Sequence, residues 1–484
     1  MEAPARDGQC VTVPVHCDDS MTCCIRTAQL ESWGAILSWL RTLELRWLTL
    51  IRLTAPTAVA QVTDTSSMSR PRQQRLLIIA LNFAPELTGI GKYVADMTTR
   101  FAEADIAIRV IAAPPYYPAW TVQRGYSAGR YARETRAGAL VYRCPLYVPR
   151  QASGSRRLLH LLSFALSSFP LTLWLAVTWR PHTVFVVEPP LVCAPASLLA
   201  ARLCRAHTWL HVQDFEVDAA FELGLLRAGA LRRAALACER WLLRRFDRVS
   251  TISAPMLRRL SDKGVDAART CYFPNWVDTT AIGPLHGSNP LRARLGIPAE
   301  CPVLLYSGNM GEKQGLDLIL QVAERLAGTR TALFLLCGDG AARSRLEAAA
   351  AGATNLRFIP LQPLELLNEL LNLADVHLLP QRADAQDLVM PSKLSAIMAS
   401  GRPVIVSARD GSDLAQAAAY GGLVVPPSDA AAFEQAIGRL LDDGALRQRL
   451  GESGRAYATE HWDREVVLGR AVALLLHTND TSVG

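Results

Sequence analysis

The sequence predicts an α/β protein built from two doubly wound, Rossmann-like domains. Short apolar runs alternate with amphipathic segments along most of the chain, and a polar stretch with glycine and proline at 283–290 interrupts the series once. The length of 484 residues agrees, because about 150 residues per domain gives two or three domains. Ligands of such sheets bind at the carboxyl ends of the strands, so we expect a substrate in a central cleft that the two domains face.

The N-terminal Rossmann-like domain is predicted to span 75–282. It opens with a strand at 76–81, a glycine-bearing loop, a helix at 92–104 and a strand at 106–112, which together form a βαβ unit. Further strands are predicted at 184–187, 208–212, 248–252 and 270–273. Helical segments separate them, as a parallel sheet requires.

A C-terminal Rossmann-like domain is predicted for 283–460. Its strands are expected at 303–307, 333–337, 356–360, 376–379, 404–407 and 422–425. Residues 461–484 are expected to form a helix that returns towards the N-domain, followed by a tail.

Residues 1–74 are predicted to be a leader or a poorly ordered extension. They show no alternation of strand and helix, and charged residues break their apolar stretch at 33–60, so it fits neither a signal peptide nor a spanning helix. Met68 stands shortly before the first predicted strand. Residues 1–67 are therefore either a translated leader or a short accessory extension.

The composition excludes several classes of protein. Apolar residues make up 50% and charged residues 20%, with 31 Gly and 28 Pro, which excludes collagen-like, disordered and disulfide-rich chains. The 51 Lys and Arg exceed the 44 Asp and Glu by seven. That excess favours phosphates or an anionic membrane surface and is too small for a nucleic-acid-binding protein.

The eleven cysteines indicate a reducing compartment. Four lie within the first 24 residues, and the other seven stand singly among apolar runs. The spacing fits neither a zinc site nor a secreted disulfide framework. The sequence therefore predicts a cytoplasmic protein without a metal site.

Three loops at predicted strand ends are candidates for phosphate binding. In the first, Gly89 and Gly91 precede a helix whose free amides and dipole favour an anion. A dinucleotide fingerprint would need a third glycine at Val94, so NAD is only weakly indicated, and a plain tight turn is the alternative.

The other two loops belong to the second predicted domain. One carries Lys313 just before a helix, where a flexible cation suits a diphosphate; the alternative is a solvated loop lysine. The other begins a helix near Pro391 that ends at Gly401, which leaves the amides up to Lys393 at a positively polarised helix end. The alternative for this loop is a simple capped helix.

Several motifs in order resemble glycosyltransferase family 4 of GT-B fold, and most closely its branch for colanic acid biosynthesis. They are PExxGIGKY, HVQD, SGNxGxKQG, CGDG, VMPSKLxxxMASGRPVIV and GGLVVPP, between roughly residues 75 and 470. The resemblance implies a retaining, metal-independent hexosyltransferase without a cofactor. It acts on a nucleotide-sugar, with GDP-fucose suggested and a UDP-sugar or another GDP-sugar as the alternative.

The resemblance also implies which residues bind and react. It makes the first domain the acceptor domain and the second the donor domain. The donor-binding residues would be Gly89, Gly91, Asn309, Gly311, Lys313, Phe358, Leu361, Asp387, Met390, Pro391, Ser392 and Lys393. The catalytic residues would be Lys313, Asp214 and His211, with the latter two near the sugar.

Three positions depart from the family pattern. Asn309 stands where the family usually has arginine, and both of two glutamates spaced eight apart are missing: Ala396 occupies the second, and the first falls on Gln386, Asp387 or Leu388. Asp387 is the nearest remaining carboxylate. The loss of the second glutamate, which normally holds the ribose, leaves the nucleotide open and raises an alternative function: a non-catalytic, nucleotide-binding scaffold at the membrane.

Two segments indicate contact with a membrane. Residues 158–179 carry no charge, but a spanning helix there would split the predicted sheet, so a covering or interfacial helix pair broken near Pro170 is preferred. A helix at 231–246 is predicted to place Arg233, Arg240, Arg244 and Arg248 opposite a stripe formed by Leu231, Ala235, Cys238, Leu242 and Phe246. With Trp174, these arginines form the predicted membrane or acceptor face, and a core helix with a solvated basic side is the alternative.

These features predict an enzyme of exopolysaccharide biosynthesis that is peripheral on the inner face of the plasma membrane. Its expected acceptor is a polyprenyl-diphosphate-linked oligosaccharide.

Overall fold

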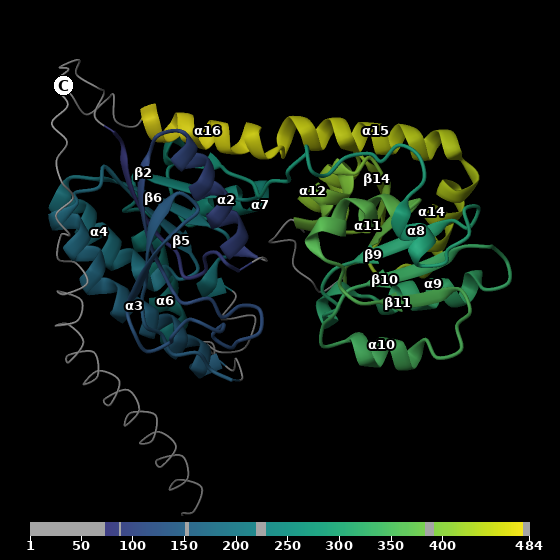
Figure 1. Cartoon of the computed structure of the whole chain (residues 1–484), viewed down its shortest axis with the longest axis horizontal. Helices are drawn as coiled ribbons and strands as arrows, with labels where there is room; N and C mark the ends of the chain where they lie inside the picture. Colours follow the sequence, from purple (N-terminus) through teal and green to yellow (C-terminus); the bar gives the residue numbers. More distant parts are fainter. Residues whose placement is uncertain (1–72, 87–88, 151–153, 219–228, 383–391, 478–484) are drawn as a thin grey trace, which may run out of the picture. The chain divides into compact units, whose positions relative to one another are not determined.

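The computed structural model describes residues 73–477 apart from 87–88, 151–153, 219–228 and 383–391. Residues 1–72 of the predicted leader, Asp387, and the start of the VMPSKL motif with Met390 and Pro391 lie outside the described residues. Two sheets are described, each with helices on both of its faces (Figure 1).

In the described part of the chain the first sheet has eight strands, in the order β3-β4-β2-β1-β5-β6-β7-β8. Neighbouring strands are parallel except for the antiparallel pair β3 and β4. The strands are β1 (Arg75–Ile79), β2 (Ala107–Ala112), β3 (Ala132–Arg136), β4 (Ala139–Arg143), β5 (Thr183–Glu188), β6 (His207–Val212), β7 (Arg248–Thr251) and β8 (Thr270–Tyr272).

Alternate residues of each buried strand supply opposite faces of this sheet. Leu77 and Ile79 of β1 enter one core with helices α3, α4, α6 and α7, whereas Leu76 and Ile78 enter the other with α2 and α16. These helices are α2 (Ile90–Glu103), α3 (Gly154–Thr178), α4 (Ala194–Cys204), α6 (Ala230–Leu243), α7 (Ala254–Asp262) and α16 (Arg464–His477). Figure 1 shows α2 on the opposite side of the strands from α3 and α4.

The second sheet, as described, has six parallel strands in the order β11-β10-β9-β12-β13-β14. They are β9 (Val303–Ser307), β10 (Leu333–Cys337), β11 (Leu356–Ile359), β12 (Val376–Leu379), β13 (Val404–Ser407) and β14 (Gly422–Val425). The surrounding helices are α8 (Pro290–Arg294), α9 (Asp317–Leu326), α10 (Arg343–Ala349), α11 (Leu367–Leu373), α12 (Ser392–Ala399), α13 (Asp413–Ala418), α14 (Ala430–Asp442) and α15 (Gly444–His461).

The structure confirms the predicted α/β fold class and every predicted strand to within two residues at either end. Buried parallel strands consist of apolar residues on both faces, so they are conspicuous in the sequence. The prediction omitted β3 and β4, an edge hairpin around Ala137 and Gly138, both of which have positive φ angles. β3 contains three charged residues and is largely exposed, so its sequence lacks the apolar run that marked the other strands.

Two predictions about helices were wrong. The segment 158–179 is one helix, α3, with Pro170 inside it, rather than a helix pair. Helix α6 ends at Leu243, and Arg248 lies in β7, where its guanidinium donates a hydrogen bond to the Leu474 carbonyl. The apolar stripe is also shorter than predicted, since Leu242 and Phe246 are buried but Cys238 is exposed.

Helix α16 packs against the first sheet although it is the last helix along the chain. Val467, Leu468 and Leu475 belong to the same core as α2, and Arg100 of α2 pairs with Glu465 at 2.9 Å. The end of the chain therefore contributes to the core that supports the first glycine loop.

Candidate functional site

Glycine residues let the ends of β9 and β10 pack backbone to backbone. A Cβ atom on Gly338 would lie 1.9 Å from the Gly308 carbonyl oxygen, and one on Gly340 would lie 2.5 Å from the Met310 carbonyl oxygen. The Met310 amide donates to the Asp339 carbonyl at 2.8 Å. The SGN and CGDG motifs thus form one close-packed pair of loops at the carboxyl end of the second sheet.

Lys393, near the start of α12, lies across this pair of loops. Its Nζ donates a hydrogen bond to the Tyr306 hydroxyl at 2.8 Å and lies 4.4 Å from the centre of the Tyr306 ring. A Cβ on Gly308 would lie 2.6 Å from the same Nζ atom. Burial lowers the pKa of Lys393 to about 8. Lys393 is therefore a largely buried amine beside these loops. Its positive charge lies where it can bind an anion.

The other predicted donor residues of this domain differ in exposure and in position. Asn309 and Leu361 are exposed, Phe358 is half-buried against the core, and Gly311 precedes a short 3-10 turn at Glu312–Gln314. Lys313 lies in that turn, and Ser392 begins α12. The structure thus brings Lys393, Asn309 and Gly311 to one region.

In the first sheet, Glu86 organises the loop that precedes α2. Its Oε1 accepts hydrogen bonds from the Tyr116 and Tyr117 amides at 2.9 Å, and Oε2 accepts one from Asn82 at 2.9 Å. Burial raises the pKa of Glu86, and these hydrogen bonds oppose the rise. A Cβ on Gly91 would lie 2.8 Å from Glu86 Oε2, which explains why this position is glycine.

Arg143, at the end of β4, was missed by the sequence analysis. Its guanidinium is fully buried, donates to the Ala84 and Ala113 carbonyls and pairs with Glu134 at 2.7 Å. The arginine therefore ties the hairpin to the loop that carries Glu86. The sequence signal for this role is an arginine at the end of a short apolar run, Ala139 to Tyr142.

His211 lies inside the first domain between the Phe185 and Phe273 rings. Its Nδ1 is 2.9 Å from the Ser250 hydroxyl and its Nε2 is 2.9 Å from Gln213 Nε2. Burial lowers the pKa of His211 to about 3, so the imidazole is neutral at physiological pH. Asp214, the other predicted catalytic residue of this motif, is half-buried at the end of β6.

The last residue of β5, Glu188, is a buried acidic group. Glu188 has no exposed surface, and neither of its carboxylate oxygens has a hydrogen-bond partner among the described residues. Burial raises the pKa of Glu188 well above its ordinary value, and the carboxylates of Glu216 and Glu239 raise it further. The fold therefore favours the protonated form of Glu188 more than the unfolded chain does.

We expect Glu188→Gln to stabilise the protein increasingly as the pH rises. The folded state binds this proton more tightly than the unfolded state, so the wild type loses stability as the pH increases above the ordinary glutamate pKa, by at most about 1.4 kcal/mol per pH unit. Glutamine copies the protonated form and removes this loss. Urea unfolding between about pH 5 and pH 8 measures it, with exposed Glu300→Gln as the control. Parallel profiles for wild type and Glu188→Gln would contradict the assignment.

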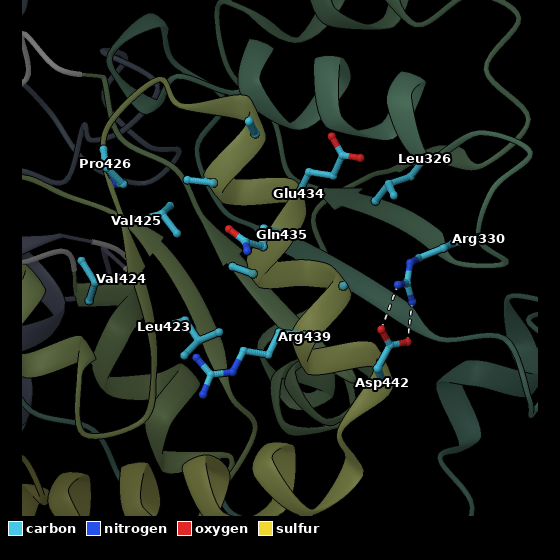
Figure 2. A pocket seen from close by; sticks show the side chains of 14 residues that line it. Leu326, Arg330, Leu423, Val424, Val425, Pro426, Glu434, Gln435, Arg439 and Asp442 are labelled. Atoms are coloured by element: carbon cyan, nitrogen blue, oxygen red, sulfur yellow. Dashed lines mark hydrogen bonds and ion pairs between the residues drawn. The ribbon is translucent and has the colours of Figure 1, made fainter.

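One cavity of about 850 Å³ lies away from all these loops. Figure 2 shows residues of α14 and β14 around it, with the bidentate pair between Arg330 and Asp442 at its edge. It contains none of the predicted site residues. Within the described residues, no group of three or more His, Cys, Asp and Glu side chains is placed to hold a metal ion.

The predicted membrane face is only partly as expected. Arg233, Arg240 and Arg244 are exposed on or beside α6, but Trp174 is half-buried against the core of the first sheet. Trp174 therefore contributes less exposed surface to this face than the sequence analysis expected.

The two α/β domains, with glycine loops at their strand ends, have the GT-B fold that glycosyltransferases of similar structure share. Residues 88–276 match the model of the glycosyl transferase 4-like domain, and residues 301–443 match that of glycosyl transferases group 1. The chain belongs to the glycosyltransferases of family 4 type.

Individual relatives agree with this assignment. The chain is 41% identical over 404 residues to a colanic acid biosynthesis glycosyl transferase, WcaI, of Escherichia coli strain K12, with 81% of this chain and 98% of that protein covered. Sucrose-phosphate synthase from Thermosynechococcus elongatus has a similar structure, with a TM-score of 0.64, 19% identity and coverage of 85% and 100%. Anabaena HepE in complex with UDP-glucose gives a TM-score of 0.59 at 13% identity, with 84% and 100% covered.

Proposed function

We propose that this glycosyltransferase moves a sugar, with retention of configuration, from a nucleotide-sugar to a polyprenyl-diphosphate-linked oligosaccharide in colanic-acid-like exopolysaccharide biosynthesis. The single observation that carries the donor side is Lys393 Nζ beside the Gly308 turn. A GDP-sugar, with fucose as the first candidate, is the proposed donor, as the motifs' resemblance to the colanic acid branch suggests, and a UDP-sugar is the alternative. The proposed location is the cytoplasmic face of the membrane.

In this proposal the donor diphosphate contacts Lys393 and Lys313 and the amides of the glycine loops. Negative charge on the leaving diphosphate grows as the glycosidic bond breaks, so fixed cations and amides there stabilise the transition state more than the ground state. Asp214 orients the sugar, and neutral His211 holds Gln213 in place through the hydrogen bond between their side chains. Glu86 and Arg143 position the Gly89 loop.

The test of this function is transfer by purified protein. Incubation with GDP-fucose, UDP-glucose and other nucleotide-sugars, and a lipid-linked oligosaccharide extract, should give a glycosylated acceptor whose anomeric configuration matches that of the donor. An inverted product would contradict the retaining mechanism.

Ala396, which replaces a ribose-binding glutamate of the family, favours a second function, a non-catalytic scaffold that binds nucleotide. Stabilisation by GDP or UDP without any transfer or donor hydrolysis would support the scaffold.

We expect transfer to continue after treatment with EDTA. Lysines and backbone amides supply the positive charge in the proposed site, so the diphosphate needs no divalent ion as counter-charge. Initial rates before and after chelation provide the measurement, and added calcium serves as a control for non-specific ion effects. Loss of activity that manganese or magnesium specifically restores would contradict this expectation.

A further inference from the structure

Helix α3 has two opposite faces of different character. Its inner face packs into the core of the first sheet, where Phe164, Leu171 and Leu175 are fully buried. Its outer face exposes Leu158, Leu162, Leu166, Phe169 and Val177. Their spacing of four, four, three and eight residues places these side chains on one stripe of the helix.

Helix α4 extends this apolar stripe. It packs beside α3 on the same face of the sheet and exposes Leu199 and Leu203, which are four residues apart. Leu158, Val177 and Leu203 are 53%, 58% and 55% exposed, respectively. A single exposed leucine is ordinary, but a row along two adjacent helices marks an interaction surface. We call these seven apolar side chains the α3–α4 surface.

The exposed charged side chains on α3, on α4 and next to their ends are all positive. Exposed arginines stand at the beginning of α3, just after its end and at the end of α4: Arg156, Arg157, Arg180, Arg202 and Arg205. Between residues 154 and 206 the sequence contains one acidic residue, Glu188, and it is buried. No carboxylate on these two helices therefore opposes binding to an anionic surface.

Helix α6 adds exposed positive charge on the same side of the first sheet. It covers the same face of the sheet, and its Arg233 and Arg240 are exposed. Trp241 is 53% exposed, and the Arg245 guanidinium lies 4.7 Å from its ring centre. An exposed tryptophan beside arginines is typical of a side chain that sits at the level of lipid headgroups.

We propose that the α3–α4 surface rests on an anionic phospholipid bilayer, with both helices lying in the interface. Charge complementarity selects this partner, because the apolar row can enter the acyl boundary while arginines at both ends bind headgroup phosphates. The proposal deepens the proposed function, on which it rests for a lipid-linked acceptor. Burial raises the pKa of both Tyr116 and Glu216, and the nearby charge of Arg157 opposes this rise, so this end of α3 is near the strand ends that carry the site.

The packing of α3 favours this arrangement over a membrane span. The helix is long and apolar enough to cross a bilayer, because it has 24 residues at Ser155–Thr178 and contains an 18-residue stretch with a mean hydropathy of 1.7. Half of that stretch, however, is buried inside the protein. A spanning position would remove Phe164, Leu171 and Leu175 from the core and expose the part of the sheet that α3 covers. Only the outer stripe is available to lipid.

The apolar part of the surface is tested by vesicle flotation of the full chain. Wild type should float with vesicles of phosphatidylglycerol and phosphatidylethanolamine, and binding should fall at least about ten-fold in the combined variant Leu158→Gln, Leu162→Gln, Leu166→Gln. The matched control is Leu364→Gln with Leu476→Gln, two exposed leucines elsewhere. Circular dichroism and melting temperature establish that each variant folds.

The charged part is tested by Arg156→Gln, Arg157→Gln and Arg202→Gln together. Each arginine near an anionic surface contributes roughly five-fold to binding, so this variant should bind far less and lose most of its salt dependence. Exposed Arg294→Gln with Arg449→Gln on the other domain is the control. Vesicles of phosphatidylcholine alone should bind wild type weakly.

These experiments test membrane binding by the α3–α4 surface separately from the proposed glycosyltransferase function. Unchanged flotation of both variants, or no flotation of wild type, would overturn the proposal. So would equal binding to anionic vesicles and to neutral vesicles, because the arginines would then have no role. Donor hydrolysis in solution should be the same in the variants and wild type, whereas transfer to acceptor embedded in vesicles should fall. If no transfer occurs with any protein, the proposed function fails while flotation still decides the surface.

Discussion

Lys393→Met should lower kcat by about 100-fold while the protein stays folded. Methionine keeps the aliphatic part of the side chain but removes the ammonium group that lies beside the Gly308 turn. The loss is comparable to that of one oxyanion-hole donor, because the proposed charge on the leaving diphosphate develops in the transition state. Steady-state kinetics with the identified donor measures kcat and KM separately, and the effect should fall mainly on kcat.

The pH dependence gives this prediction a second readout. Burial lowers the pKa of Lys393 to about 8, so the free enzyme loses the cation as the pH rises through that value, and kcat/KM should fall above about pH 8. Arginine remains protonated throughout this range, so Lys393→Arg should restore part of the activity and shift the alkaline fall to higher pH.

Two results would contradict the role of Lys393. Near-wild-type kcat in Lys393→Met would show that the donor diphosphate is held elsewhere. If kcat/KM of Lys393→Arg still falls above about pH 8, the group that titrates there is not Lys393. Lys313→Ala is the useful comparison, because the family resemblance assigns the donor-phosphate cation to that lysine. A loss of about 100-fold in Lys313→Ala alone would assign the cation to the 3-10 turn rather than to α12.

Gly338→Ala should destabilise the second domain by about 3 kcal/mol and weaken donor binding. The new methyl carbon would stand 1.9 Å from the Gly308 carbonyl oxygen, and the obstacle is backbone, which cannot rotate away as a side chain could. The Gly308 loop would have to move away from the end of β10. Since Lys393 lies against the same loop, the site should lose its geometry together with the packing.

Thermal unfolding and GDP or UDP titration measure these two effects. Gly469→Ala is the matched control, because nothing lies within 4 Å of a Cβ at this position of α16, and alanine there should stabilise by up to about 1 kcal/mol. An unchanged melting temperature in Gly338→Ala would show that the two loops are further apart than the structure places them.

Much of the fold could be predicted because its signals are local. A strand such as β5 is buried on both faces and therefore consists of consecutive apolar residues, and helix α2 repeats its buried residues Val94, Met97 and Phe101 at helical spacing. The strand β3 gave no such signal, because it lies at the edge of the sheet and is largely exposed.

The candidate site was predictable in position but not in its contacts. Glycine loops that follow strands gather at one edge of a parallel sheet, so the sequence could identify the loops at Gly89 and Gly308. It could not show that Lys393 would reach Tyr306, 87 residues away, or that Arg143 would support the Gly89 loop through the Ala84 carbonyl. Such contacts depend on which strands become neighbours.

By itself, the sequence determined the two doubly wound domains, the order of their strands along the chain and the apolar, charge-free length of α3, because each follows from residues close together in the chain. Only the tertiary structure decided which side of α3 is exposed, that Trp174 is half-buried, and that His211 is a buried neutral group. The physical reason is that burial is a property of the whole assembly. A side chain is removed from water by elements that are distant in sequence, and its exposure, pKa and available partners follow from that removal.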